Sequence, residues 1–135
     1  MATIYHAAPV TVPARVAWDF LERYSRSEVH VFSVCVDEYQ DGDYRVVVLA
    51  DGSEVRERNV TVDPERMRAV YTVPGLGAEH HQAEMRLVVH GNDAVILEWC
   101  TDVLPHAFAE QLRDVFEPMF QELLTAVNHH QMPEG

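Results

Sequence analysis

The stretch from residue 30 to residue 103 consists of short segments rich in β-branched and aromatic residues, separated by turn sequences such as DGD, DGS and PGLG. Segments of this kind predict β-strands, and turns this short join antiparallel neighbours. The predicted strands cover residues 30–39, 43–50, 53–62, 67–74, 80–90 and 94–103. Such a run of consecutive strands predicts an antiparallel sheet.

Helical periodicity is found on both sides of this run. Residues 3–10 predict one more strand, and residues 12–24 predict a helix with Pro13 in its first turn. After Pro105, apolar side chains at helical spacing form one long stripe: Phe108, Leu112, Phe116, Met119, Leu123 and Val127. Pro118 lacks a backbone donor and is expected to kink this helix. The predicted fold class is α+β: a curved antiparallel sheet wrapped around a long C-terminal helix, with a hollow between them.

Length and charge limit the organisation and the partners of the chain. Its 135 residues fit one domain, with a frayed tail over residues 128–135. The formal net charge of −12 disfavours nucleic acid and anionic lipid as partners. No apolar run reaches the roughly 20 residues that span a bilayer, and the N-terminal residues do not resemble a signal peptide. We therefore expect a cytoplasmic protein without membrane insertion; a homodimer stays open.

Several familiar chemistries lack their residues in this sequence. The ten basic residues are all Arg, which removes lysine Schiff-base chemistry, and no phosphate-binding glycine loop, G-x-S-x-G, CxxC or HExxH sequence is present. Cys35 and Cys100 are expected to be small buried hydrophobes. The stretch EHHQAEM (79–85) suggests a metal cluster, but on a strand His80 and His81 point to opposite faces. We expect neither a metal nor an organic cofactor.

Three stretches carry a family resemblance: VPARVAWDFL (12–21), DGSEVRERNVTVDPERMRAVYTV (51–73) and AVILEWCTDVLP (94–105). Together with the layout, they resemble the helix-grip superfamily of START domains, Bet v 1 allergens, bacterial polyketide cyclases and dehydratases, and plant abscisic-acid receptors. The resemblance implies a single START/Bet v 1-like domain over residues 1–135, with a deep, mostly apolar cavity between the sheet and the last helix. The receptors hold a hormone carboxylate with a pocket lysine, so the absence of Lys argues against that branch.

Two registers are open for the hairpin formed by residues 80–90 and 94–103. A two-residue turn at Gly91-Asn92 would place three pairs on one face: Met85 with Glu98, Ala83 with Cys100, and His81 with Asp102. A three-residue loop that includes Asp93 would give other pairs: Met85 with Trp99, Leu87 with Leu97, and Arg86 with Glu98. The second register leaves a cleanly apolar inner face. The first is favoured, because it matches a Gly-led turn and because the resemblance implies a pocket-lining glutamate in a similar LE stretch.

The candidate catalytic residues are Glu98, His81, Asp102 and Glu57. In the favoured register Glu98 is a carboxylate in apolar surroundings, where burial raises the pKa. His81 and Asp102 form a hydrogen-bonded pair suited to a general base. Glu57 alternates with Val55 and faces inward if Val55 is buried. The plainer alternatives are a surface ion pair for Glu98, a partly exposed His81, and a charged outer face around Glu57.

The candidate ligand contacts are Met85, Cys100, Tyr71, Phe108, Phe116, Met119 and Phe120. Those on the last helix are core residues by default, but core and pocket wall overlap in this architecture. The favoured function is a cofactor-independent enzyme of the polyketide cyclase/dehydratase kind, which positions a hydrophobic small molecule and moves protons. The alternatives are a non-enzymatic carrier or sensor of a lipid-like or aromatic ligand, and a protein-interaction module.

Overall fold

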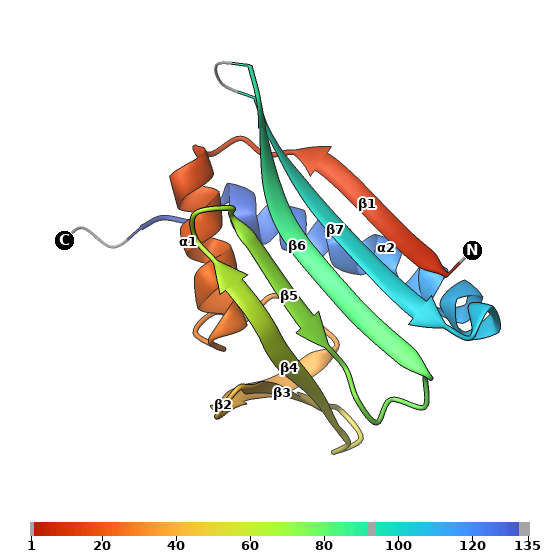
Figure 1. Cartoon of the computed structure of the whole chain (residues 1–135). Helices are drawn as coiled ribbons and strands as arrows, with labels where there is room; N and C mark the ends of the chain where they lie inside the picture. The colour runs from red at the N-terminus through yellow and green to blue at the C-terminus, as the bar shows by residue number, and fades with distance from the viewer. Residues whose placement is uncertain (1, 92–93, 133–135) are drawn as a thin grey trace.

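The computed structural model describes residues 2–91 and 94–132, which form one curved antiparallel sheet with two helices against its concave face (Figure 1). The strands are β1 (Thr3–Pro9), β2 (Cys35–Asp41), β3 (Tyr44–Leu49), β4 (Glu54–Asp63), β5 (Arg68–Thr72), β6 (His80–His90) and β7 (Ala94–Leu104). The helices are α1 (Ala14–Ser25) and α2 (His106–Asn128). The seven strands lie in the order β1-β7-β6-β5-β4-β3-β2. The predicted sheet and long C-terminal helix are confirmed.

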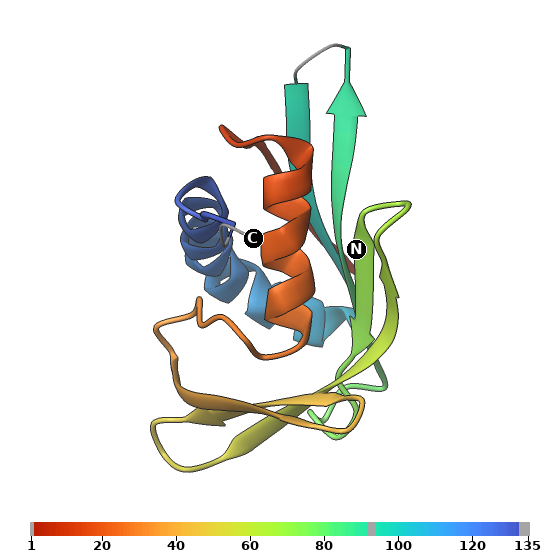
Figure 2. The same cartoon turned by 90° about the vertical axis from the view of Figure 1, so that its left-hand side faces the viewer.

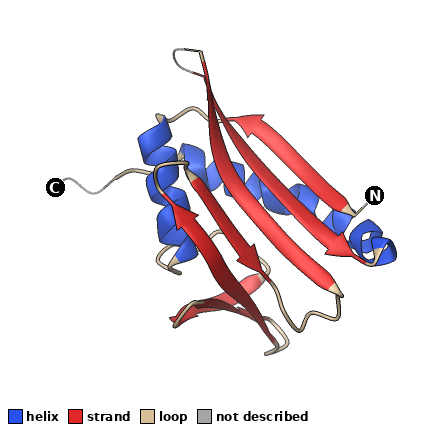
Figure 3. Cartoon of the chain, viewed as in Figure 1, coloured by secondary structure: helices blue, strands red, loops and turns tan. Residues whose placement is uncertain are grey.

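The sheet curves so that β2 and β3 turn in below the two helices (Figure 2). The strand predicted to begin at residue 30 begins only at Cys35, and a loop precedes it (Figure 3). The reason is local: the backbone N–H of Cys35 donates to the carbonyl of Phe32 at 3.1 Å, which closes a turn, and the Phe32 ring is buried in the core. At the other end of the chain, α2 continues through Pro118 without ending there.

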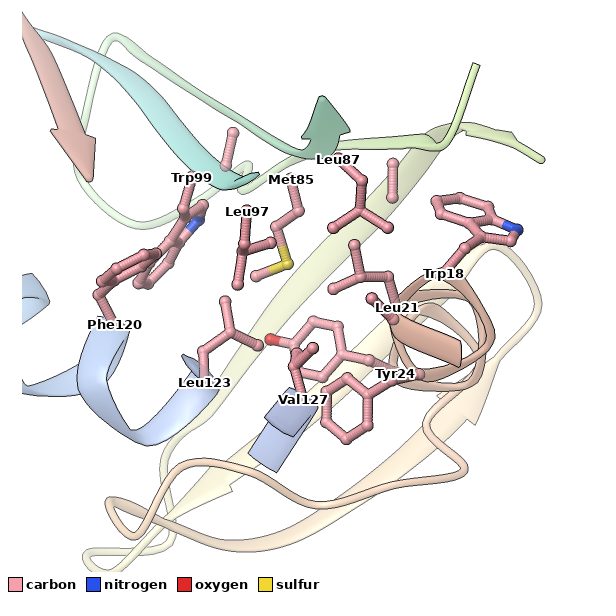
Figure 4. Packing of buried hydrophobic residues seen from close by; sticks show 14 of the residues in the cluster. Trp18, Leu21, Tyr24, Met85, Leu87, Leu97, Trp99, Phe120, Leu123 and Val127 are labelled. Atoms are coloured by element: carbon pink, nitrogen blue, oxygen red, sulfur yellow. The ribbon is translucent and has the colours of Figure 1, made fainter. Parts of the chain in front are cut away.

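The core lies where α1 and α2 meet the concave face of the sheet. Figure 4 shows side chains from four elements pointing toward one another: Trp18, Leu21 and Tyr24 of α1, Leu123 and Val127 of α2, Met85 and Leu87 of β6, and Leu97 and Trp99 of β7. Beyond α2, His130 Nε2 lies 2.7 Å from Asp19 Oδ2 of α1. Part of the predicted frayed tail is therefore held against α1; residues 133–135 lie outside the described residues.

The hairpin of β6 and β7 has the register that the sequence analysis disfavoured. Arg86 pairs with Glu98, and the pairs Met85–Trp99 and Leu87–Leu97 lie on either side of it. The expected inward position of Glu98 is therefore wrong. The physical reason is burial: this register puts the apolar side chains of both strands on one face, and that face packs on the helices. Asn92 and Asp93, on which the expected turn depended, lie outside the described residues.

Candidate functional site

A cavity of about 240 Å³ lies between the curved sheet and the first half of α2. Its wall is formed by side chains from the end of α1, the loop before β2, strands β2 to β7 and α2. The rim is apolar and partly exposed, and includes Val34, Leu76 and Val115. Polar side chains gather on the sheet wall. The site is thus an apolar pocket with a few convergent polar groups, which is the usual form of a small-molecule site.

Three aromatic rings form a stack in the wall of the cavity: Phe32 from the loop before β2, Trp99 from β7 and Phe116 from α2. The centroids of Phe32 and Trp99 are 5.9 Å apart, and those of Trp99 and Phe116 are 5.1 Å apart, with interplanar angles of 21° and 13°. All three side chains line the cavity. Parallel rings at these distances present broad, flat apolar surface, which suits a planar or ring-shaped ligand.

A buried ion cluster occupies the sheet wall. The β3–β4 register places Arg45 directly opposite Glu57, and Arg45 Nη1 donates to Glu57 Oε1 at 3.0 Å. Arg45 Nη2 also lies 2.8 Å from Oε2 of Glu38 on β2, within ion-pair distance but outside hydrogen-bond geometry. The side chains of Arg45 and Glu38 are 2% and 1% exposed. One cation therefore lies between two carboxylates deep in the protein.

The protonation of this cluster follows from its burial and its charges. Burial raises the pKa of Glu57 above its ordinary value and outweighs the opposite effect of Arg45. Burial by itself would lower the pKa of Arg45. The interactions with Tyr24, Glu57 and Glu38 together raise that pKa by more, so Arg45 stays protonated. The guanidinium carbon of Arg45 also lies 4.1 Å from the centroid of the Tyr24 ring, in a cation–π contact. Glu57 is therefore the group in this cluster that is suited to exchange a proton.

Two tyrosines and a histidine are further polar residues in the cavity wall. Burial raises the pKa of Tyr24 and of Tyr71, so both phenols are protonated donors. Tyr71 Oη accepts a hydrogen bond of 3.3 Å from Trp99 Nε1, and Tyr24 Oη has no hydrogen-bond partner among the described residues. Burial lowers the pKa of His81, which keeps its imidazole neutral near pH 7. A ligand in the cavity thus meets phenol donors, a neutral imidazole and a carboxyl group.

The structure brings together five of the residues that the sequence analysis selected and separates the others. Those that line the cavity are Glu57, His81, Tyr71, Phe116 and Met119. Those away from its wall are Glu98, Asp102, Met85, Cys100, Phe108 and Phe120. Met85 and Phe120 are buried in the core, and Cys100 and Phe108 are partly buried outside the cavity wall.

The expected surroundings of Glu98 and Asp102 are wrong because of the register. Glu98 is bonded to Tyr5 and Arg86, with Arg86 Nε 2.5 Å from Glu98 Oε1, and the hydrogen bond from Tyr5 followed by that from Arg86 lowers its pKa. Asp102 is exposed and accepts a hydrogen bond of 2.6 Å from Thr3. Asp102 pairs with Gln82 and His81 with Val103, so the predicted His81–Asp102 pair does not form.

The sequence analysis missed Arg45, Glu38 and Tyr24. A signal for Arg45 was present: it alternates with Val47 and Leu49 in YRVVVL, so it shares their face of the strand. Counting residues across the DGS turn would also have paired it with Glu57. Glu38 had a similar signal, because counting across the DGD turn pairs it with Val47, on the face of Arg45. Tyr24 lies at helical spacing with Phe20 and Leu21, which predicts burial but not contact with Arg45.

The burial of His81 predicts a pH dependence of stability. Its pKa in the folded protein is below its ordinary value of 6.5, so its contribution is fully present above that pH and is lost as the pH falls toward the folded value. We expect the wild type to lose more free energy of unfolding than His81→Gln between pH 7.5 and pH 5. Urea unfolding of both proteins across this range measures the difference. Parallel curves would contradict the assigned burial.

Within residues 2–91 and 94–132, no group of three or more His, Cys, Asp and Glu side chains is arranged to hold a metal ion. His80 and His81 are separated as the strand geometry predicted: His80 is exposed and His81 is buried. In the same described part of the chain, neither helix is long and apolar enough to cross a membrane.

Comparisons with known proteins agree on the fold. No protein-family model matches the sequence, and no curated protein matches it either. Among solved structures, a protein from Thermobifida fusca is 21% identical with a TM-score of 0.73, and each chain covers 100% of the other. Norcoclaurine synthase from Thalictrum flavum, in complex with a transition-state analogue, is 19% identical with a TM-score of 0.68, over 93% of this chain and 92% of that one.

A third similar structure is DynU16, a protein of the dynemicin biosynthetic locus, at 17% identity and a TM-score of 0.67. The match covers 96% of this chain and 48% of DynU16. This chain therefore shares the fold of these proteins, a curved antiparallel sheet wrapped around a long C-terminal helix, which is the helix-grip fold.

Proposed function

We propose that the chain binds a compact hydrophobic molecule in the cavity and catalyses its cyclisation or dehydration, as an enzyme of the polyketide cyclase/dehydratase kind. The observation that carries this proposal is Glu57: a buried carboxyl group with a raised pKa that opens into an apolar, aromatic-walled cavity. A raised pKa brings a carboxyl group closer to working pH, which favours a role as proton acceptor and donor.

Each part of the site has a role in such a reaction. The stacked rings of Phe32, Trp99 and Phe116 hold the ligand in a folded conformation, which lowers the entropic barrier to ring closure. Glu57 takes a proton from carbon or oxygen and returns it to a leaving hydroxyl group. In this proposal the protonated phenol of Tyr71 donates to a developing oxyanion, which its raised pKa and its position in the cavity wall support. These residues require no organic cofactor.

A carrier or sensor of an aromatic ligand is the second candidate. The observation that favours it is the strongly apolar rim, where Val34 and Val115 are each about half exposed. In a carrier, Glu57 and Tyr71 would anchor the ligand without changing it. The two candidates differ in one measurable respect: an enzyme releases a product that differs from the bound molecule.

Native mass spectrometry of the protein purified from its own host tests the proposal. We expect an adduct whose mass fits a hydrophobic molecule, which is released on denaturation. Incubation of the extracted molecule with fresh protein should then yield a product of equal mass, for cyclisation, or one lighter by a molecule of water. An extracted molecule that is recovered unchanged supports the carrier. Protein without any adduct, and without binding to small aromatic compounds, contradicts both candidates.

A bulky side chain on the α2 side of the cavity should exclude the ligand. Leu112 lines the cavity, and its neighbour Gln111 is exposed. We expect Leu112→Trp to weaken ligand binding by about tenfold or more, because the indole competes for the same volume, which corresponds to about 1.4 kcal/mol. Gln111→Trp is the matched control and should bind as the wild type does. Equal occupancy of the two variants in native mass spectrometry would place the ligand elsewhere.

A further inference from the structure

We propose that the ligand of this cavity is a compact ring compound that carries a positively charged nitrogen, which pairs with Glu57. This inference rests on ligand binding in the cavity, as proposed above, and not on catalysis. It narrows the ligand class from hydrophobic molecules in general to aromatic or cyclic amines. The basis is the count of charges on the sheet wall.

The buried cluster has one more carboxylate than cations. Among the described residues, Arg45 is the one buried cation that pairs with Glu38 and Glu57. His30 is a second cation-capable group beside the cluster, with Nδ1 3.1 Å from Glu38 Oε2, but its side chain is 66% exposed and solvent screens it. An unbalanced buried negative charge is unfavourable. This imbalance accords with the raised pKa of Glu57, and a cationic ligand would relieve it without neutralising the carboxylate.

Glu57 is the member of the cluster that a ligand can reach. Its side chain lines the cavity and keeps 15% of its surface accessible. Arg45 also lines the cavity but is only 2% exposed, and Glu38 is 1% exposed and lies behind the lining. Among the described residues, the donor to Glu57 is Arg45 Nη1 on Oε1, which leaves Oε2 for a ligand. A ligand ammonium there would extend an alternating row of charges: ammonium, Glu57, Arg45, Glu38.

The same geometry argues against an anionic ligand. Arg45 lines the cavity and is the cation that a ligand carboxylate would need, and its Nε and Nη2 have no hydrogen-bond partner among the described residues. Its charge, however, is already shared by two carboxylates, and its side chain is 2% exposed and lies over the Tyr24 ring. A carboxylate in the cavity would instead face Glu57 and meet repulsion in a medium where charges are poorly screened. The pocket therefore discriminates by charge at its sheet wall.

The volume and the aromatic wall of the cavity fit a small ring compound. An engineered cavity of about 150 Å³ is known to bind benzene, so the roughly 240 Å³ here has room for one ring and a short substituent, or for two fused rings. The stacked Phe32, Trp99 and Phe116 rings supply the surface against which such a ring packs. They also add cation–π attraction for a charged nitrogen.

Isothermal titration calorimetry with three probes of similar size tests the charge preference at pH 7.5: 2-phenylethylamine, 2-phenylethanol and 3-phenylpropionate. We expect the amine to bind about tenfold tighter than the alcohol, and the carboxylate to bind weakest, as one charge-assisted contact predicts. An alcohol or carboxylate that binds as tightly as the amine overturns the inference. Such a result leaves cavity binding itself intact, provided that Leu112→Trp weakens it.

The charge on Glu57 is tested separately with Glu57→Gln, which keeps the shape, against Glu98→Gln on the opposite face of the sheet. We expect the amine preference to fall to about twofold in Glu57→Gln and to persist in Glu98→Gln. If no probe binds to wild-type protein, both the inference and ligand binding in this cavity fail. A preference that persists in Glu57→Gln overturns the inference alone.

The pH dependence in wild-type protein provides a second measurement if Glu57→Gln does not fold. Amine affinity should rise with pH through the raised pKa of Glu57, since only the ionised form pairs with the cation, whereas the affinity of the alcohol should change little. The titratable or charged groups around Glu57 are Arg45 on β3, Glu38 and Cys35 on β2, His30 in the loop before β2, Tyr24 on α1, Tyr71 on β5 and His81 on β6. An amine affinity independent of pH contradicts the inference.

Discussion

Arg45→Ala is expected to lower the free energy of unfolding by about 3–5 kcal/mol, because it leaves Glu38 and Glu57 buried without their shared cation. The side chain it removes is 2% exposed, so water cannot replace the lost charge at low cost. Urea unfolding followed by circular dichroism measures the change. The variant should also lose the cation–π contact with Tyr24, which adds to the effect.

Arg56→Ala is the matched control. Arg56 is on the neighbouring strand and pairs with Asp41, but its side chain is 40% exposed. Its removal should cost less than about 1 kcal/mol. The pH provides a further check: without Arg45 the pKa of Glu57 should rise further, so the deficit of Arg45→Ala relative to wild type should shrink as the pH falls. A loss below about 1 kcal/mol for Arg45→Ala would contradict the assigned burial of the cluster.

Glu57→Gln is expected to lower turnover of the native substrate by roughly 100- to 10,000-fold, the usual contribution of a positioned acid or base. The amide has the shape of the carboxyl group but cannot exchange a proton, so ligand binding should suffer less than the chemical step. The measurement is kcat and KM for the molecule extracted from the protein. In wild type, a rate-limiting base would make kcat rise with pH through the raised pKa of Glu57; a rate-limiting acid would make it fall.

Glu98→Gln separates this role from a general effect of charge. Glu98 is hydrogen-bonded to Tyr5 and Arg86 away from the cavity. The turnover of the Glu98→Gln variant should therefore stay within about twofold of wild type. A Glu57→Gln variant with wild-type kcat, while folded and ligand-bound, would remove the enzyme proposal and favour the carrier.

The fold was predictable because its signals are local and repeated. The period of the apolar residues changes from helix to strand and back, and each turn carries Gly, Asp or Pro. The boundary error at β2 arose where an apolar run, VHVFSV, serves the core through Phe32 from a loop. Composition cannot distinguish that loop from a strand: the run is rich in Val and Phe, but Phe32 is buried and Val34 is about half exposed.

The site was less predictable because it depends on register. One residue more or less in the β6–β7 connection moves Glu98 from one face to the other. Glu57 was placed correctly on the cavity side because its neighbour Val55 sets the face within the same strand. The register of the β2–β3 hairpin places Glu38 on the face of Arg45, but the contact of Arg45 with Tyr24 needs α1 to pack on the sheet, which no local pattern encodes.

The edge position of β1 has a consequence for how the protein is made. Thr3 pairs with Asp102, 99 positions further along the chain, and β1 has β7 as its neighbour in the sheet. During translation β1 therefore emerges long before the strand that completes its hydrogen bonds, and contacts of such high sequence separation form slowly. Ile4 is buried in the complete sheet, but its strand lacks a partner until β7 has been synthesised. The cavity can close around a ligand only after the ribosome has released β7 and most of α2.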